Sequence, residues 1–412
     1  MTSGGRAART VVLCADGTCN AFGHSSSNVA RLLRHIALGE GQVACYDQGV
    51  GTLQRERRGI EAFRATLADP SALALLPAPS DRWSRPWTWW SRVAAMTHGR
   101  GLDVNVGQLY GALAVRYASG DRVFMFGFSR GAFTVRALAG LVWGYGLPAT
   151  ADAGAAAARF AEAWPLFAGE YARHDGSGAA RAREFVERHG QRPCPVHFLG
   201  LWDTVKSYGG IRPVMLPRLR HNPSVATVRH ALALDERRGW FEATTWGWLD
   251  SDRRADPPSA SHRLPDDVKA RLGDQDVAEV WFTGSHPDVG GGAGHERSSE
   301  IAHRWMLGEA RVAGLALNPA GLAFLAQDDP PPVAVPTRGL LWRAVEMKAR
   351  HRIDNSGEWP RSVPGARGAS PREPAVSARG GTVWHHATVT AHPMLADLPG
   401  GVVLRPRPTV RP

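Results

Sequence analysis

The stretch from Val123 to Leu141 (VFMFGFSRGAFTVRALAGL) constrains the fold more than any other part of this chain. It begins with four apolar residues without polar alternation, as in a parallel strand that is buried on both faces. The pentapeptide Gly127–Gly131, a G-x-S-x-G, follows, and the apolar spacing then becomes helical. A serine on a tight turn between a strand and a helix predicts a nucleophile elbow, which holds the serine hydroxyl at the carboxyl end of the strand.

The residues of this pentapeptide suggest a division of roles. A side chain at either glycine would collide with the neighbouring strand or helix, so both positions need glycine. Ser129 is the expected nucleophile, and the amide of Arg130, at the helix N-terminus, is an expected donor to an oxyanion. The alternative is a glycine-tight turn whose serine only caps the helix.

The rest of the chain alternates short buried strands with helices, which predicts an α/β fold with a mostly parallel sheet. Ligands of such sheets bind outside the carboxyl ends of the strands, so the residues that follow each strand are candidates for a site. The clearest strands are Val11–Ala15, Val43–Asp47, Val196–Trp202 and Val277–Phe282.

The loop after the first strand begins Asp16-Gly17-Thr18. Because it lies at the same edge of the sheet as Ser129, a backbone amide of Gly17 or Thr18 is a candidate second donor to an oxyanion. An Asx turn that starts a helix is equally compatible with these residues.

Two later strands end in residues suited to a triad. Asp203 follows Val196–Trp202 and is the candidate acid, although an aspartate there could also cap the next turn. His286 follows Val277–Phe282 and precedes three glycines that let the backbone fold closely, which makes it the best-placed base. Asp288 is the alternative acid.

Two further segments bear on the site. The segment VRHALALDERRGWF, from Val228, is expected to form a helix that carries His230. A late segment, Thr382–Val389, alternates as a strand does, and His386 or His392 near it is the alternative base, because α/β-hydrolases usually place their histidine late in the chain.

A tryptophan-rich insertion, residues 58–99, interrupts the alternation of strands and helices. Trp83, Trp87, Trp89 and Trp90 lie within it among arginines. Indole rings beside arginine suit contact with a membrane interface, a lid over an apolar acyl pocket, or a satellite core packed on the main domain. The chain is expected to comprise a catalytic domain, 1–315, which includes this insertion, and a Pro/Arg/Gly-rich extension, 316–412, packed on the domain or partly irregular.

The charge, the cysteines and the hydropathy of the chain limit which partners, cofactors and locations are expected. The net charge of +11 favours an acidic partner, but an arginine-rich chain can equally reflect a GC-rich genome, and without a nucleic-acid motif no nucleic acid is expected. The four cysteines lack the spacing of a metal site or a disulfide framework, so no metal or cofactor is expected. Without a signal peptide or an apolar stretch that spans a membrane, we expect a cytoplasmic protein, with export by a dedicated secretion system as the alternative.

Taken in order, several motifs resemble one family. They are DGTCN at Asp16, GFSRGA around Ser129, FLGLWDTV around Asp203, HALALDERR at His230 and WFTGSHPDVGGG at His286. The chain is similar to the α/β-hydrolase-like family of unassigned function that includes the catalytic domain of type VI secretion phospholipase effectors. The resemblance implies an α/β-hydrolase-like fold, with helices on both faces of the sheet. For characterised members it implies hydrolysis of phospholipid acyl esters.

The expected chemistry is acyl-ester hydrolysis through a covalent intermediate, with a lipid or a small ester as substrate. Ser129 attacks, His286 transfers the proton and Asp203 holds the imidazole, in the chain order Ser, Asp, His of α/β-hydrolases. Two alternatives remain. One is a hydrolase of a soluble ester or a peptide on the same fold, and the other is a catalytically inactive binding protein.

Overall fold

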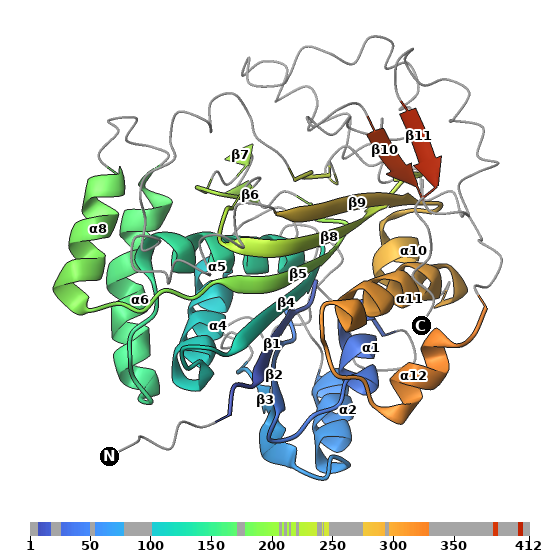
Figure 1. Ribbon diagram of the computed structural model, residues 1–412, viewed down its shortest axis with the longest axis horizontal. Coiled ribbons are helices and arrows are strands. Elements are labelled where there is room, and N and C mark those ends of the chain that lie inside the picture. The colour runs from blue at the N-terminus through green and yellow to red at the C-terminus, as the bar shows by residue number, and fades with distance from the viewer. Residues whose placement is uncertain are drawn as a thin grey trace.

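In the part of the chain that the structure describes, the centre of the fold is a nine-stranded parallel sheet with strand order β11-β10-β9-β8-β5-β4-β1-β2-β3 (Figure 1). The computed structural model describes residues 7–17, 26–49, 54–77, 101–170, 178–205, 208–209, 212–213, 216–219, 222–236, 241, 243–246, 275–292, 296–328, 382–385 and 403–406. The strands of the sheet are β1 (Thr10–Ala15), β2 (Gln42–Asp47), β3 (Leu73–Leu75), β4 (Arg122–Phe128), β5 (Val196–Trp202), β8 (Val225–Ala233), β9 (Asp276–Phe282), β10 (Thr382–His385) and β11 (Val403–Pro406). Two short strands, β6 (Tyr208–Gly209) and β7 (Arg212–Pro213), form a separate antiparallel pair.

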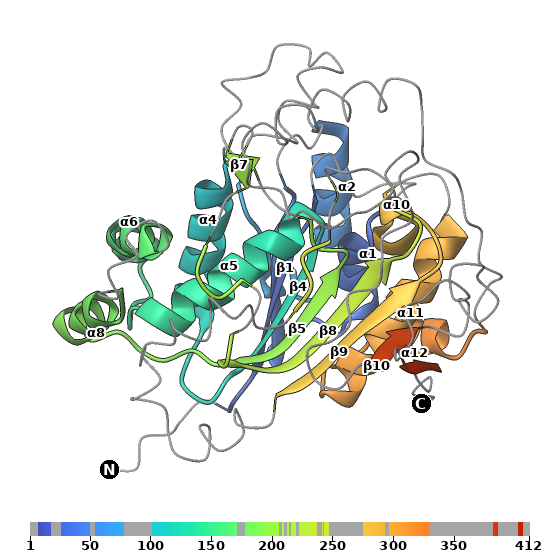
Figure 2. The same cartoon turned by 90° about the horizontal axis from the view of Figure 1, so that it is seen from above.

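Helices cover both faces of the sheet (Figures 1 and 2). One face carries α4 (Leu102–Arg116), α5 (Arg130–Tyr145), α6 (Ala153–Ala168) and α8 (Gly178–His189). The other carries α1 (Asn28–His35), α2 (Gln54–Ala65), α10 (His286–Gly290), α11 (Glu296–Val312) and α12 (Pro319–Leu325). The expected α/β fold with a parallel sheet is therefore confirmed.

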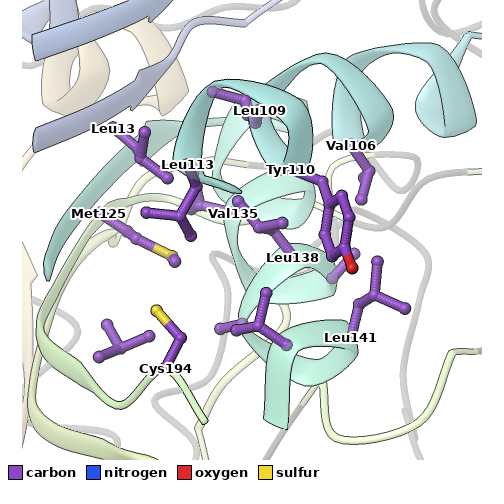
Figure 3. Close-up of a cluster of buried hydrophobic side chains, with 14 of the residues drawn as sticks. Leu13, Val106, Leu109, Tyr110, Leu113, Met125, Val135, Leu138, Leu141 and Cys194 are labelled. Carbon is purple, nitrogen blue, oxygen red and sulfur yellow. The ribbon is translucent and has the colours of Figure 1, made fainter. Parts of the chain in front are cut away.

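Each face of the sheet has its own apolar core, because successive residues of a strand point to opposite faces. Along β1, Leu13 belongs to one buried cluster and Cys14 to the other. Figure 3 shows the first cluster, in which Leu113 of α4 and Leu138 of α5 pack near Met125 of β4. Burial on both faces explains why the central strands read as continuous apolar runs.

The expected helix at Val228 is wrong, because the first six residues of this segment, 228–233, belong to strand β8. β8 lies between β5 and β9 and pairs in parallel with both. Its alanines and leucines favour a helix locally, but pairing on both sides and burial on both faces outweigh that preference.

The tryptophan-rich insertion and the C-terminal extension both contribute strands to the same sheet, in those parts of them that the structure describes. The first part of the insertion forms most of α2, a 3-10 helix (Pro70–Ala72) and the edge strand β3. In the C-terminal extension, α12 packs on α1, and β10 and β11 continue the sheet beyond β9. The four tryptophans of the insertion lie outside the described residues.

Candidate active site

Ser129 occupies a strained turn between β4 and α5. Its backbone has φ 58° and ψ −121°, a conformation that costs a residue with a side chain about 1–3 kcal/mol. The Ser129 amide donates to the Trp202 carbonyl at 3.0 Å, which ties the turn to the end of β5. The serine directly follows the last residue of β4 and is buried, with 8% of its surface exposed.

The two glycines around Ser129 are required by close backbone contacts. A Cβ at Gly127 would lie 2.6 Å from the backbone of Ala132, and one at Gly131 would lie 2.1 Å from the Ala15 carbonyl oxygen. Such distances are far inside van der Waals contact. The expectation that side chains at these positions would collide with the neighbouring helix or strand is confirmed.

Asp203 lies next to this turn at the end of the adjacent strand. Phe128, the last residue of β4, is paired with Trp202, the last residue of β5. Ser129 follows Phe128 and Asp203 follows Trp202, so the two residues leave adjacent strands at the same level. Asp203 is fully buried and, like Ser129, has a positive φ, 39°. Its Oδ1 accepts a hydrogen bond from the Ala233 amide at 3.0 Å.

His286 brings its imidazole to the second oxygen of Asp203. The His286 Nδ1 lies 2.6 Å from Asp203 Oδ2, and both side chains are buried. Nδ1 therefore bonds to the carboxylate, as in a histidine whose orientation an aspartate fixes. The ring also packs 4.6 Å from the ring of Phe128, the residue before Ser129, and 4.9 Å from that of Phe241.

Asp288, the alternative acid, has a different partner. Its Oδ2 accepts from the Ser285 amide at 2.9 Å and from the Ser285 hydroxyl at 2.6 Å, which caps the first turn of α10. Between the two aspartates, the contact with the His286 imidazole is made by Asp203. The alternative bases His386 and His392 lie outside the described residues.

Asp16, at the end of β1, organises the first loop. Its buried carboxylate accepts from the Ser27 hydroxyl, from the Tyr46 hydroxyl at 2.8 Å and from the Gly17 amide at 2.7 Å. Burial, and then the charge of Asp16, raise the pKa of Tyr46. The Gly17 amide is thus already engaged in this structure, and Thr18 lies outside the described residues.

Sequence reasoning missed two carboxylates that contact the candidate residues. Glu236 accepts from the backbone amide of His286 at 3.2 Å, and Glu279 contacts the buried His230. Glu236 lies in the HALALDERR motif, and this motif is the only sequence signal that could have drawn attention to it. Because the motif is expected to form a helix, the sequence offers no reason to place Glu236 beside His286. Nothing in the local sequence around Glu279 indicates its role.

The described residues offer no group of three or more histidines, cysteines, aspartates or glutamates able to hold a metal ion. Within the same residues, no helix combines the length and the apolar character that crossing a membrane requires.

Comparison with known proteins gives three kinds of match. The family described as the catalytic domain of type VI secretion system (T6SS) Tle1-like phospholipase effectors matches residues 9–309. An uncharacterised protein of Saccharomyces cerevisiae is 28% identical over 244 residues, which are 57% of this chain and 32% of that protein. The chain therefore spans about a third of the length of this curated relative.

Two solved structures are similar over most of the chain. An uncharacterised protein from Pseudomonas aeruginosa is 22% identical, with a TM-score of 0.40, over 78% of this chain and 49% of its own. A Tle1 effector bound to the VgrG spike of the type VI secretion system is 17% identical, with a TM-score of 0.27, over 70% of this chain and 52% of its own.

Proposed function

The chain belongs to the family of Tle1-like catalytic domains of type VI secretion phospholipase effectors, and from this membership and the site geometry we propose that it hydrolyses acyl esters of lipids, with Ser129 as nucleophile. The observation that carries the proposal is the contact between His286 Nδ1 and Asp203 Oδ2 at 2.6 Å, beside the strained turn of Ser129. Three residue types that act together in acyl transfer follow strands β4, β5 and β9 of the same parallel sheet, which supports the proposal.

The proposed reaction assigns one step to each of the three residues. Ser129 Oγ attacks the ester carbonyl carbon while His286 Nε2 takes the hydroxyl proton, and Asp203 stabilises the imidazolium that forms. The tetrahedral intermediate then breaks its bond to the alcohol, which leaves with the proton from His286. A water molecule, activated by the same imidazole, attacks the acyl-enzyme and releases the carboxylate.

The developing oxyanion needs hydrogen-bond donors near Ser129. The amide of Arg130 opens α5, at the positive end of the helix dipole, and is the first donor in this proposal. The second donor in this proposal is a backbone amide of Gly17 or Thr18, and the Gly17 amide would first have to leave Asp16.

Hydrolysis assays on two substrates test the proposal. The wild-type protein should cleave a short soluble ester and release fatty acid from phospholipid vesicles, and Ser129→Ala should lower both rates by about four orders of magnitude or more. Cleavage of the soluble ester alone would favour a hydrolase of soluble substrates. A folded wild type that cleaves no ester would favour a binding protein.

Membrane contact through the tryptophan-rich insertion is a further part of the proposal. Replacing Trp83, Trp87, Trp89 and Trp90 with alanine should weaken binding to vesicles while leaving hydrolysis of the soluble ester nearly unchanged. A loss of folding stability with vesicle binding intact would instead identify these residues as a satellite core.

Family membership also supports export by a type VI apparatus as a proposal. Comparing the culture medium of bacteria with and without a working apparatus tests this route. Equal amounts of the protein in both media would contradict it.

A further inference from the structure

A second buried histidine–carboxylate pair, His230 and Glu279, contacts the turn that contains Asp203. His230, on β8, is fully buried, and its Nδ1 lies 2.8 Å from Glu279 Oε1 on the neighbouring strand β9. The two residues are register partners in the sheet. On the other side of the ring, His230 Nε2 accepts a hydrogen bond from the backbone amide of Thr204, the residue after Asp203, at 3.1 Å.

These contacts determine the tautomer of His230. An amide can only donate, so Nε2 must carry a lone pair, and the single ring proton must be on Nδ1, facing Glu279. Burial of the ring lowers the pKa of His230, which favours this neutral form. Glu279 therefore holds the proton on the side where His230 can still accept from Thr204.

The carbonyl of Thr204, like its amide, has a hydrogen-bond partner. The Thr204 carbonyl accepts from the Thr244 amide at 2.9 Å, and Glu279 Oε1 also accepts from the Trp246 amide at 2.7 Å. Arg136, buried in α5, donates to the Thr244 carbonyl at 2.6 Å. The Thr204 amide and carbonyl are thus bonded by His230 and Thr244, which Glu279 and Arg136 contact in turn.

Asp203 needs such support because its own conformation is unfavourable. A residue with a side chain and a φ of 39° remains there only when its surroundings impose it. Its carboxylate must also face His286 with one oxygen and the Ala233 amide with the other. A small rotation of this turn would misdirect the carboxylate.

We propose that His230 and Glu279 are positioning residues, which hold the Thr204 amide and thereby orient the Asp203 carboxylate toward His286. This inference rests on the proposed function for its effect on rate, but its structural content is independent of activity. It also assigns a role to the HALALDERR motif, which the chemistry at Ser129 leaves unused.

Loss of this support should affect the chemical step rather than substrate binding. Misplacement of a reacting group by about 1 Å costs on the order of 10²-fold in rate, so His230→Phe should lower kcat by about 10²-fold with little change in KM. Glu279→Ala should lower kcat by about tenfold, which is less than the loss expected for a misplacement of about 1 Å. His230 remains in this variant, but without Glu279 its ring proton can move to Nε2, where it would face the Thr204 N–H and break that hydrogen bond.

Two matched variants serve as controls. His230→Gln retains a side-chain acceptor for the Thr204 amide and should recover most of the activity. His197→Phe makes the same substitution at the opposite end of β5 from Asp203, where His197 Nε2 contacts the Ala313 carbonyl. It should leave kcat within about twofold of the wild type, because that end of the strand lies far from the reacting groups.

The decisive readout is the proton NMR signal of the His286–Asp203 hydrogen bond, recorded far downfield on the full chain. It should shift or broaden in His230→Phe and Glu279→Ala and stay unchanged in His197→Phe. An unchanged signal in folded His230→Phe and Glu279→Ala, with unchanged kcat, would overturn the inference and leave His230 as a packing residue. Should the wild type cleave no ester, the proposed function fails, and this signal alone still decides whether His230 orients Asp203.

Discussion

Replacing Gly131 with alanine tests whether the turn at Ser129 requires glycine, because the new methyl group would have no space. Its Cβ would lie 2.1 Å from the Ala15 carbonyl oxygen and 2.7 Å from the Asp16 carbonyl oxygen. Both are backbone atoms, and β1 is held between β4 and β2 by parallel pairing, so neither side can yield without a shift of a strand or of α5. Overpacking of a core typically costs 1–3 kcal/mol, and we expect about 3 kcal/mol or more for this contact.

Gly111 provides the matched control. It lies inside α4, and a Cβ there would meet nothing within 4 Å. Alanine at an open helical position should stabilise the protein by about 0.5–1 kcal/mol. Urea unfolding followed by tryptophan fluorescence should therefore move the two midpoints in opposite directions. A Gly131→Ala protein as stable as the wild type would refute the account of the turn.

Two further predictions concern carboxyl groups. Burial raises the pKa of Asp47 from 3.8 to about 7, so its contribution to stability is present at low pH and lost as the pH rises through about 7. Asp47→Asn should flatten the pH dependence of the free energy of unfolding between pH 4 and 7, by at most about 1.4 kcal/mol per pH unit, and an identical pH dependence in both proteins would contradict this. Asp203→Asn should lower kcat by about 10⁴-fold, whereas Asp288→Ala should cost about 1 kcal/mol of stability and little activity. The reverse result would exchange the roles of the two aspartates.

The turn at Ser129 could be predicted from the sequence because its determinants are local. An apolar run, two glycines and a helical pattern occupy one continuous stretch, and the required glycines report directly on backbone crowding. The positions of Asp203 and His286 could be predicted nearly as well. In a parallel sheet the residues after the strands share an edge, so identifying the strands was enough to bring these two together.

The role of Asp288 could also have been predicted from local sequence. Ser285 and Asp288 have the spacing of a capping box, in which a serine precedes an acidic residue by three positions at the start of a helix. The structure has this arrangement, and the carboxylate bonds to Ser285 rather than to the imidazole.

Strand β8 could not be predicted from its own residues. The alanines and leucines around His230 favour a helix, and the strand forms because β5 and β9 pair with it on both sides. The contacts of Glu236 with His286 and of Glu279 with His230 join residues 50 and 49 positions apart. No local pattern encodes such contacts, since they depend on where distant strands meet.

The most direct test of the central claim is to identify the residue that a serine-directed fluorophosphonate modifies. Mass spectrometry of the digested wild-type protein should find the label on Ser129, because only an activated hydroxyl reacts quickly with this probe. Labelling should disappear in Ser129→Ala and slow strongly in His286→Ala, while Gly111→Ala should label at the rate of the wild type. Modification of another residue, or undiminished labelling of Ser129→Ala, would contradict the assignment of Ser129 as the nucleophile.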